Sequence, residues 1–121
     1  MGVLIYIVDD EPLLLELASA ILEPLGYAIE TYRDPETALQ AFRLADPPPA
    51  LIITDYMMHS MTGLEFAEAC RQTRPQQKFL LVTGTVGPEV LRGSAVSSGR
   101  FLAKPYQANQ LIDKVKAALT N

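Results

Sequence analysis

Residues 3–10 read Val-Leu-Ile-Tyr-Ile-Val-Asp-Asp, an unbroken apolar run that ends in two carboxylates. An apolar run of this length, rich in β-branched side chains, predicts a strand that is covered on both faces. Strands of that kind are typical of parallel sheets flanked by helices. From Pro12 the apolar period changes to that of a helix, with the stripe Leu14, Leu17, Ala18, Ile21, Leu22 and Leu25, and Gly26 ends it.

The same alternation of strand and helix continues along the whole chain. Further strands are predicted at 27–32, 51–54, 79–83 and 101–103, and further helices at 34–45, 63–73, about 88–98 and 108–119. Strict alternation with short connections predicts a parallel sheet with helices on both faces. Because the segment 27–32 is half polar, we place it at the sheet edge, which gives the order 2-1-3-4-5. The predicted fold is a doubly wound α/β fold of flavodoxin-like type, with five strands and five helices.

Composition limits the classes of function. With 121 residues, 49% hydrophobic and 20% charged, the chain is expected to form one globular domain over residues 1–121. A net charge of −4 without a basic run argues against a nucleic-acid binder. Cys70 has no partner for a disulfide, and no apolar run is long enough to cross a bilayer, so we expect a cytoplasmic protein with no membrane contact.

Polar residues follow four of the predicted strands. Asp9-Asp10 ends the first strand, Asp55 the third, Thr83-Gly84 the fourth and Lys104-Pro105 the fifth. Ligands of such sheets bind at the carboxyl ends of the strands, where the strand order reverses. Three carboxylates in one crevice repel each other and favour a hard cation, so the sequence predicts a Mg²⁺ site. Lys104 would add a second positive charge, Thr83 a hydroxyl donor, and Asp55 a carboxylate nucleophile for phosphoryl transfer.

The segments 8–12, 54–58, 82–84 and 101–105 together resemble the receiver domain of two-component response regulators. The resemblance implies that Asp55 accepts a phosphoryl group from a histidine kinase or a histidine phosphotransfer protein. It implies that Asp9 or Asp10, with Asp55 and the backbone carbonyl of Met57, holds Mg²⁺. It also implies that the Lys104-Pro105 bond is often cis.

The resemblance further implies a switch in which Phe101 follows Thr83 inward, changing the surface of the fourth helix, fifth strand and fifth helix. That surface would serve protein partners or a dimer. The output is open: protein contacts, onward relay of the phosphoryl group, or another domain of a longer chain. Neither Met57 nor Thr85 can orient an attacking water, so self-dephosphorylation is expected to be slow, and the protein is expected to be a regulator rather than an enzyme.

Other interpretations need separate tests. A small haloacid-dehalogenase-like phosphohydrolase would want Asp-x-Asp where the chain has Asp9-Asp10-Glu11-Pro12. A flavin binder would need phosphate-binding amides in that same loop, and a pure interaction module would not need the acidic set. One of Asp9 and Asp10 is also expected to cap the first helix.

The loop after Asp55 contains the chain's single histidine, His59, where the family usually has proline. We interpret His59 as a solvent-exposed loop residue, since a role in pH modulation would require its ring to lie near the phosphate. Cys70 is expected in the core, and Met57, Met58 and Met61 are expected to pack in the loop rather than to bind a soft metal.

Overall fold

The computed structural model describes residues 2–84 and 101–120. Its strands are β1 (Leu4–Val8), β2 (Ala28–Tyr32), β3 (Leu51–Asp55), β4 (Phe79–Thr83) and β5 (Phe101–Ala103). Its helices in these ranges are α1 (Pro12–Leu22), the 3₁₀ helix η1 (Glu23–Leu25), α2 (Pro35–Leu44), α3 (Gly63–Thr73) and α4 (Ala108–Thr120). The helix predicted at 88–98 lies outside the described residues, so α4 corresponds to the last predicted helix.

The five strands form one parallel sheet in the order β2-β1-β3-β4-β5, which confirms the predicted topology. β3 lies in the middle and is buried along its whole length, whereas β2, at the edge, is mostly exposed. The half-polar composition of β2 therefore identified the edge correctly, because an edge strand has water on one side.

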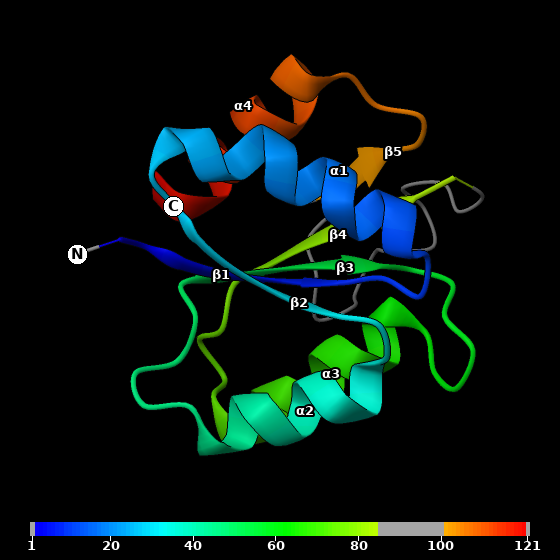
Figure 1. Cartoon of the computed structure of the whole chain (residues 1–121). Helices are drawn as coiled ribbons and strands as arrows, with labels where there is room; N and C mark the ends of the chain where they lie inside the picture. Colours follow the sequence, from blue (N-terminus) through cyan, green and yellow to red (C-terminus); the bar gives the residue numbers. More distant parts are fainter. Residues whose placement is uncertain (1, 85–100, 121) are drawn as a thin grey trace.

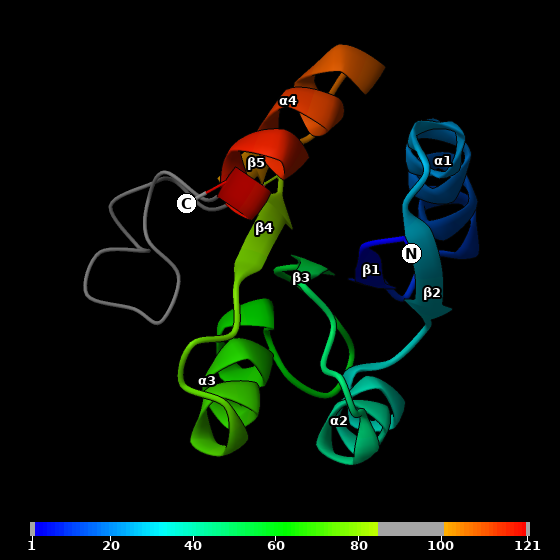
Figure 2. The same cartoon turned by 90° about the vertical axis from the view of Figure 1, so that its left-hand side faces the viewer.

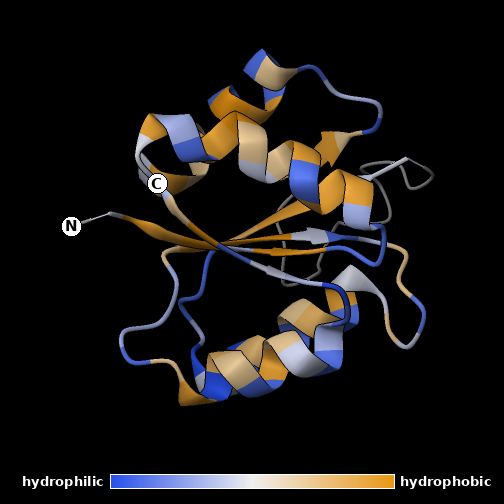
Figure 3. Ribbon diagram, in the orientation of Figure 1, coloured by the Kyte–Doolittle hydropathy of each residue, from blue (hydrophilic) through white to orange (hydrophobic). Residues whose placement is uncertain are grey.

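Two layers of helices cover the sheet. α1 and α4 pack on one face, and α2 and α3 pack on the other (Figures 1 and 2). The strands and the helices of both layers contain apolar segments (Figure 3), and their buried residues form two separate core clusters, one on each face of the sheet. Among the described residues, no helix has both the length and the apolar composition that a bilayer crossing requires.

The two clusters follow the alternation of side chains along each strand. Ile7, Ile53 and Leu102 belong to the cluster under α1 and α4. Leu81 and Phe101 belong to the cluster under α2 and α3. The same alternation continues to the carboxyl ends of the strands. It places the side chains of Asp9, Asp55 and Lys104 on the α1/α4 face of the sheet and the side chain of Thr83 on the α2/α3 face.

Local signals start two of the helices. Asp34 is the N-cap of α2, with Pro35 in its first turn, and accepts a hydrogen bond of 2.7 Å from the backbone N–H of Thr37. Thr62 and Glu65 form a reciprocal capping box at the start of α3. This box fixes the first turn of α3, and with it Gly63, directly beside the end of β3.

The predicted apolar stripe of the first helix is partly wrong. The buried residues of α1 are Leu15, Ala18 and Leu22, whereas Leu17 is 47% exposed and Leu25 43% exposed. Residues 13–15 are all leucine, so composition alone did not set the phase of the helix. Pro24 then replaces the last α-helical turn by η1, and Gly26, with a φ of 95°, ends the segment as predicted.

Candidate phosphoacceptor site

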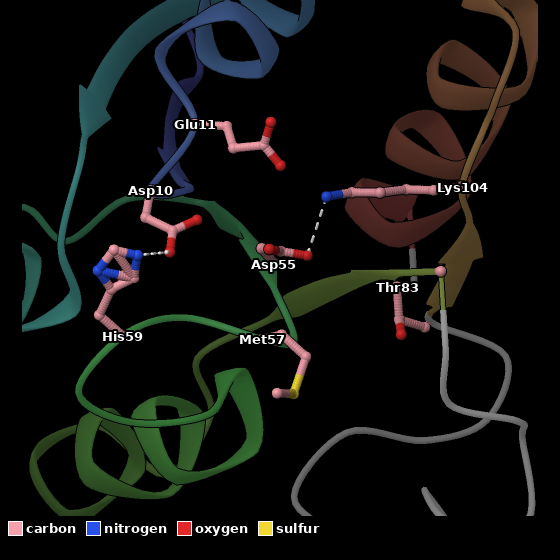
Figure 4. Close-up of a pocket in the computed structure, with 8 residues that line it drawn as sticks. Asp10, Glu11, Asp55, Met57, His59, Thr83 and Lys104 are labelled. Carbon is pink, nitrogen blue, oxygen red and sulfur yellow. Dashed lines mark ion pairs between the residues drawn. The ribbon is translucent and has the colours of Figure 1, made fainter.

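The polar residues that follow β1, β3, β4 and β5 do meet at one edge of the sheet. All of the predicted ones except Asp9 line a pocket of about 430 Å³, together with neighbouring loop residues (Figure 4). Its lining residues are Asp10, Glu11, Asp55, Met57, His59, Thr83, Gly84 and Lys104. Arg33 and Asp34, which follow the edge strand β2, are not among them, as expected from their distance across the sheet.

Asp55 is the last residue of β3 and is only 8% exposed. Its Oδ1 accepts a hydrogen bond from the backbone N–H of Tyr56 at 3.0 Å. The same oxygen lies 3.1 Å from Nζ of Lys104, which reaches it from the end of β5 (Figure 4). Both described contacts of the carboxylate are therefore made by Oδ1, and within the described chain Oδ2 has no donor.

Asp9 and Asp10 follow β1 and complete an acidic cluster with Asp55. One carboxylate oxygen of each residue lies within 4.8 Å of the others. Asp9 is 6% exposed, and its Oδ1 accepts a hydrogen bond of 2.9 Å from the backbone N–H of Glu11. The expectation that one of the two aspartates caps α1 is wrong, because Glu11 is the N-cap residue and makes no side-chain cap bond. Asp9 instead fixes the loop before the helix.

Burial dominates the electrostatics of this cluster. Burial raises the pKa of Asp9 to about 6, against the opposing effects of the Glu11 amide and Lys104. Burial also raises the pKa of Asp55, although the Lys104 ammonium and the Tyr56 amide act in the other direction. Burial by itself lowers the pKa of Lys104, but its hydrogen bond to Asp55 and the charges of Asp9 and Asp55 outweigh burial and raise it. The site thus holds more negative charge than its lysine compensates.

This donor set fits a hard divalent cation. Three carboxylate oxygens within 4.8 Å can contact one ion, because ligands on opposite sides of Mg²⁺ lie about 4.2 Å apart and small side-chain rotations close the difference. Burial, and to a smaller extent the charges of Asp55 and Asp10, raise the pKa of Asp9, and a bound cation would favour the charged carboxylates. Mg²⁺ prefers oxygen ligands, and it commonly keeps coordination positions open for water and phosphate oxygens.

Thr83 and Phe101, the two residues of the predicted switch, lie on neighbouring strands. Phe101 pairs with Leu81, and Thr83 lies two residues further along β4, so both side chains are on the α2/α3 side. Thr83 is 2% exposed and lines the pocket. Phe101 is partly buried against the cluster under α2 and α3. The two side chains therefore lie on the same face of neighbouring strands.

The peptide bond between Lys104 and Pro105 is cis, in agreement with the expectation from the resemblance. Cys70 is fully buried, and Met58 and Met61 pack against the core under α2 and α3, as predicted. The expectation that Met57 also packs is wrong, because 58% of its surface is exposed where it lines the pocket. Glu11 and Gly84 also line the pocket and were not predicted as site residues. Each directly follows a predicted site residue in the sequence, and this adjacency is the one feature from which their place in the pocket could have been predicted.

His59 is exposed, as predicted, but it is not isolated. Its side chain is 88% exposed, yet its Nε2 lies 3.0 Å from Oδ2 of Asp10 across the pocket rim (Figure 4). This contact joins the loop after β3 to the loop after β1. Sequence reasoning missed the contact because nothing in the pattern of residues 56–62 reports the path of the loop.

Comparison with known proteins gives a consistent result. The family model described as "Response regulator receiver domain" matches residues 5–116. The photosynthetic apparatus regulatory protein RegA of Rhodovulum sulfidophilum is 35% identical, covering 98% of this chain and 62% of its own length. The probable transcriptional regulatory protein TcrX of Mycobacterium tuberculosis is 29% identical, covering 97% of this chain and 50% of its own length.

A solved structure agrees in fold along nearly the whole chain. The CheY-like response regulator receiver domain protein of Methanospirillum hungatei superposes with a TM-score of 0.88 at 28% identity. The match covers 99% of this chain and 95% of that one. In contrast, the present chain spans half or less of the length of the first curated relatives that it matches.

Proposed function

Because the chain belongs to the response regulator receiver domain family, we propose that it is a phosphoacceptor switch in which Asp55 accepts a phosphoryl group. The observation that supports this most directly is the state of the Asp55 carboxylate. It is buried at the end of the central strand, is held through Oδ1 by Lys104 and Tyr56, and lies within 4.8 Å of two further carboxylates. A carboxylate in such surroundings is unexpected unless chemistry uses it.

The proposed donor is a phosphohistidine on a histidine kinase or a histidine phosphotransfer protein. Oδ2 of Asp55 forms the new O–P bond as the N–P bond of the donor breaks. The electron pair of the broken bond stays on the donor's imidazole nitrogen, which takes up a proton. Because Oδ1 is already held by two donors, the carboxylate is oriented before the phosphoryl group arrives.

The carboxylates of Asp9, Asp10 and Asp55, with the backbone carbonyl of Met57, would hold Mg²⁺. When bound, Mg²⁺ would neutralise charge between the acidic cluster and the incoming phosphoryl oxygens. Lys104 already contacts the Asp55 carboxylate. After phosphorylation its ammonium group would form an ion pair with one of the phosphoryl oxygens. The hydroxyl of Thr83, which lines the same pocket from the other side of the sheet edge, would bind a second one.

A signal would leave the site through Thr83 and Phe101. Movement of Thr83 toward the phosphoryl group would open space on the α2/α3 side of β4, and Phe101 on β5 is the neighbouring aromatic that can fill it. The surface that would change includes β5, α4 and the helix predicted at 88–98, which lies outside the described residues. We propose that protein partners, or a second copy of the chain, bind there.

Several wider features belong to the same proposal. We propose that residues 1–121 form a single receiver domain that acts in the cytoplasm and does not itself contact nucleic acid, which its net charge of −4 supports. The name of the relative TcrX refers to transcriptional regulation. If this chain also controls transcription, it would do so through a partner protein or through a further domain.

The test is phosphorylation by candidate histidine kinases and by a small-molecule phosphodonor with Mg²⁺, followed by intact-mass measurement. We expect the wild type to gain one phosphoryl group. Asp55→Asn should gain none, while Asp113→Asn, a change at an exposed position of α4, should behave as the wild type. Modification of Asp55→Asn at the wild-type rate would show that another residue is the acceptor.

A further inference from the structure

The contact between His59 and Asp10 brings an imidazole to the rim of a site whose other described side-chain ligands are carboxylates. Nε2 of His59 lies 3.0 Å from Oδ2 of Asp10, and both residues line the pocket. Asp10 is also a member of the acidic cluster with Asp9 and Asp55. One carboxylate is therefore shared between the proposed Mg²⁺ site and the imidazole.

The separation of the two atoms suits joint coordination of a metal ion. Two ligands of a tetrahedral ion, each at about 2.0–2.1 Å from it, lie about 3.3–3.4 Å apart. Nε2 and Oδ2 are 3.0 Å apart, the distance of a direct hydrogen bond, so the pair has to open by only a few tenths of an ångström to hold an ion between them. The ring is 88% exposed, so it can turn about its side-chain bonds at little cost in packing.

The chemistry of the ligands separates the two classes of divalent ion. Oxygen-only sites suit Mg²⁺, whereas imidazole nitrogen suits Zn²⁺, Ni²⁺ and Cu²⁺. His59 is the only histidine in the sequence, and the single cysteine, Cys70, is fully buried on the inner face of α3. Any strong preference of this pocket for a borderline ion must therefore act through His59.

We propose that His59 determines the metal selectivity of the pocket, adding an imidazole ligand beside Asp10 so that the site accepts Zn²⁺-like ions in competition with Mg²⁺. This inference rests on the proposed function, because it concerns the same carboxylates. In such a site the borderline ion would occupy the position that phosphorylation needs for Mg²⁺. Zinc would thus limit phosphorylation of Asp55 in this chain.

The experiment compares binding of Zn²⁺ and of Mg²⁺ to untagged wild type, His59→Ala, His59→Gln and Ser60→Ala. Glutamine can still donate a hydrogen bond to Asp10 but offers no imidazole, so it separates coordination from simple orientation of Asp10. We expect the Zn²⁺ to Mg²⁺ affinity ratio to fall about tenfold or more in both His59 variants. Ser60→Ala, a change at the adjacent exposed loop residue, should keep the wild-type ratio.

A direct readout comes from the imidazole itself. A ¹⁵N-labelled sample contains one histidine, hence one pair of ring nitrogen signals. Zn²⁺ should displace the Nε2 signal strongly, whereas Mg²⁺ should not. Unmoved ring signals with Zn²⁺, or a wild-type ratio in His59→Gln, would overturn the proposal.

A parallel measurement keeps this result separate from the proposed function. Beryllofluoride with Mg²⁺ imitates the phosphorylated aspartate, and its binding is measured on the same wild-type sample. If beryllofluoride does not bind while Zn²⁺ still shifts the imidazole signal, the phosphoacceptor role is wrong and the histidine ligand is supported. If it binds while Zn²⁺ leaves the ring unmoved, only the selectivity proposal is overturned.

Discussion

Replacing Gly63 by alanine would place a methyl group between the end of β3 and the start of α3. A Cβ built on Gly63 meets the backbone carbonyl of Asp55 at less than contact distance, and it lies 2.7 Å from Cδ1 of Leu81. The leucine side chain can turn away. The carbonyl of Asp55 cannot do so easily, because its residue belongs to the central strand and pairs with Val82.

The helix is held as firmly as the strand. The backbone N–H of Gly63 donates a hydrogen bond of 2.7 Å to the carbonyl of Tyr56. The capping box of Thr62 and Glu65, with hydrogen bonds of 2.8 and 3.1 Å, fixes the first turn of α3 in the same place. The added methyl therefore meets two backbone segments that are both constrained.

Two opposing effects set the magnitude. Alanine favours a helix over glycine by up to about 1 kcal/mol, which would stabilise the variant. Overpacking in a dense interior costs about 1–3 kcal/mol, and a backbone contact belongs at the upper end. We therefore expect Gly63→Ala to lower the free energy of unfolding by about 2 kcal/mol, a sizeable part of the roughly 5–15 kcal/mol of a typical domain.

Urea unfolding followed by circular dichroism measures this change, and about 2 kcal/mol corresponds to a midpoint shift of roughly 1 M. Gly84→Ala is the matched control, because the one described atom within reach of its added Cβ is Cβ of Lys104, at the ordinary distance of 3.7 Å. It should change stability by about 0.5 kcal/mol or less. A Gly63→Ala variant as stable as the wild type would mean that α3 and β3 can separate, and would refute a rigid contact between them.

Three further predictions concern the pKa of Asp9, the pocket lining and the buried thiol. Because burial raises the pKa of Asp9 from 3.8 to about 6, its contribution to stability is fully present below 3.8 and is lost as pH rises through about 6, by at most roughly 3 kcal/mol. Urea unfolding in a metal chelator should show this loss in the wild type, and Asp9→Asn should show a shallower pH dependence; equal slopes would contradict the assignment. Met57→Gln should shorten the lifetime of phosphorylated protein several-fold in an intact-mass time course, because an amide can orient water and a thioether cannot, while a wild-type lifetime measured in seconds would contradict slow self-dephosphorylation. Burial raises the pKa of Cys70 to about 12, so native protein should react with a thiol reagent only at the rate of global unfolding, and rapid labelling in buffer would refute the buried position.

The sheet order and the position of the site were predictable from the sequence for one physical reason. Parallel strands buried on both faces need continuous apolar residues, and their ends are then marked by the first polar residue. Asp9 follows such a run directly, Asp55 follows one after Thr54, and Lys104 follows the short apolar strand β5, so the topology alone brings them to one edge of the sheet. No knowledge of loops was required for this step.

Features that depend on loops or on helix phase were less predictable. The consecutive leucines of residues 13–15 allow more than one buried stripe, and only packing against the sheet selects Leu15. The contact of His59 with Asp10 joins two loops that no periodic pattern constrains. The capping box at Thr62 and Glu65, in contrast, was visible in the sequence as Thr-x-x-Glu before an apolar stripe.

Side-chain alternation also indicates how a phosphoryl group on Asp55, as proposed, would affect the rest of the domain. Asp55 and Lys104 lie on the α1/α4 side of the sheet edge, whereas Thr83 shares the other side with Phe101. A phosphoryl group on Asp55 that contacts both Lys104 and Thr83 must therefore span the edge of the sheet. Its contact with Thr83 would then change the packing of the core under α2 and α3, and its contact with Lys104 would change the charged pocket. Substituting Thr83 by alanine should accordingly leave acceptance of the phosphoryl group largely intact while uncoupling it from changes around Phe101, because the lysine contact and the Thr83 contact lie on opposite faces.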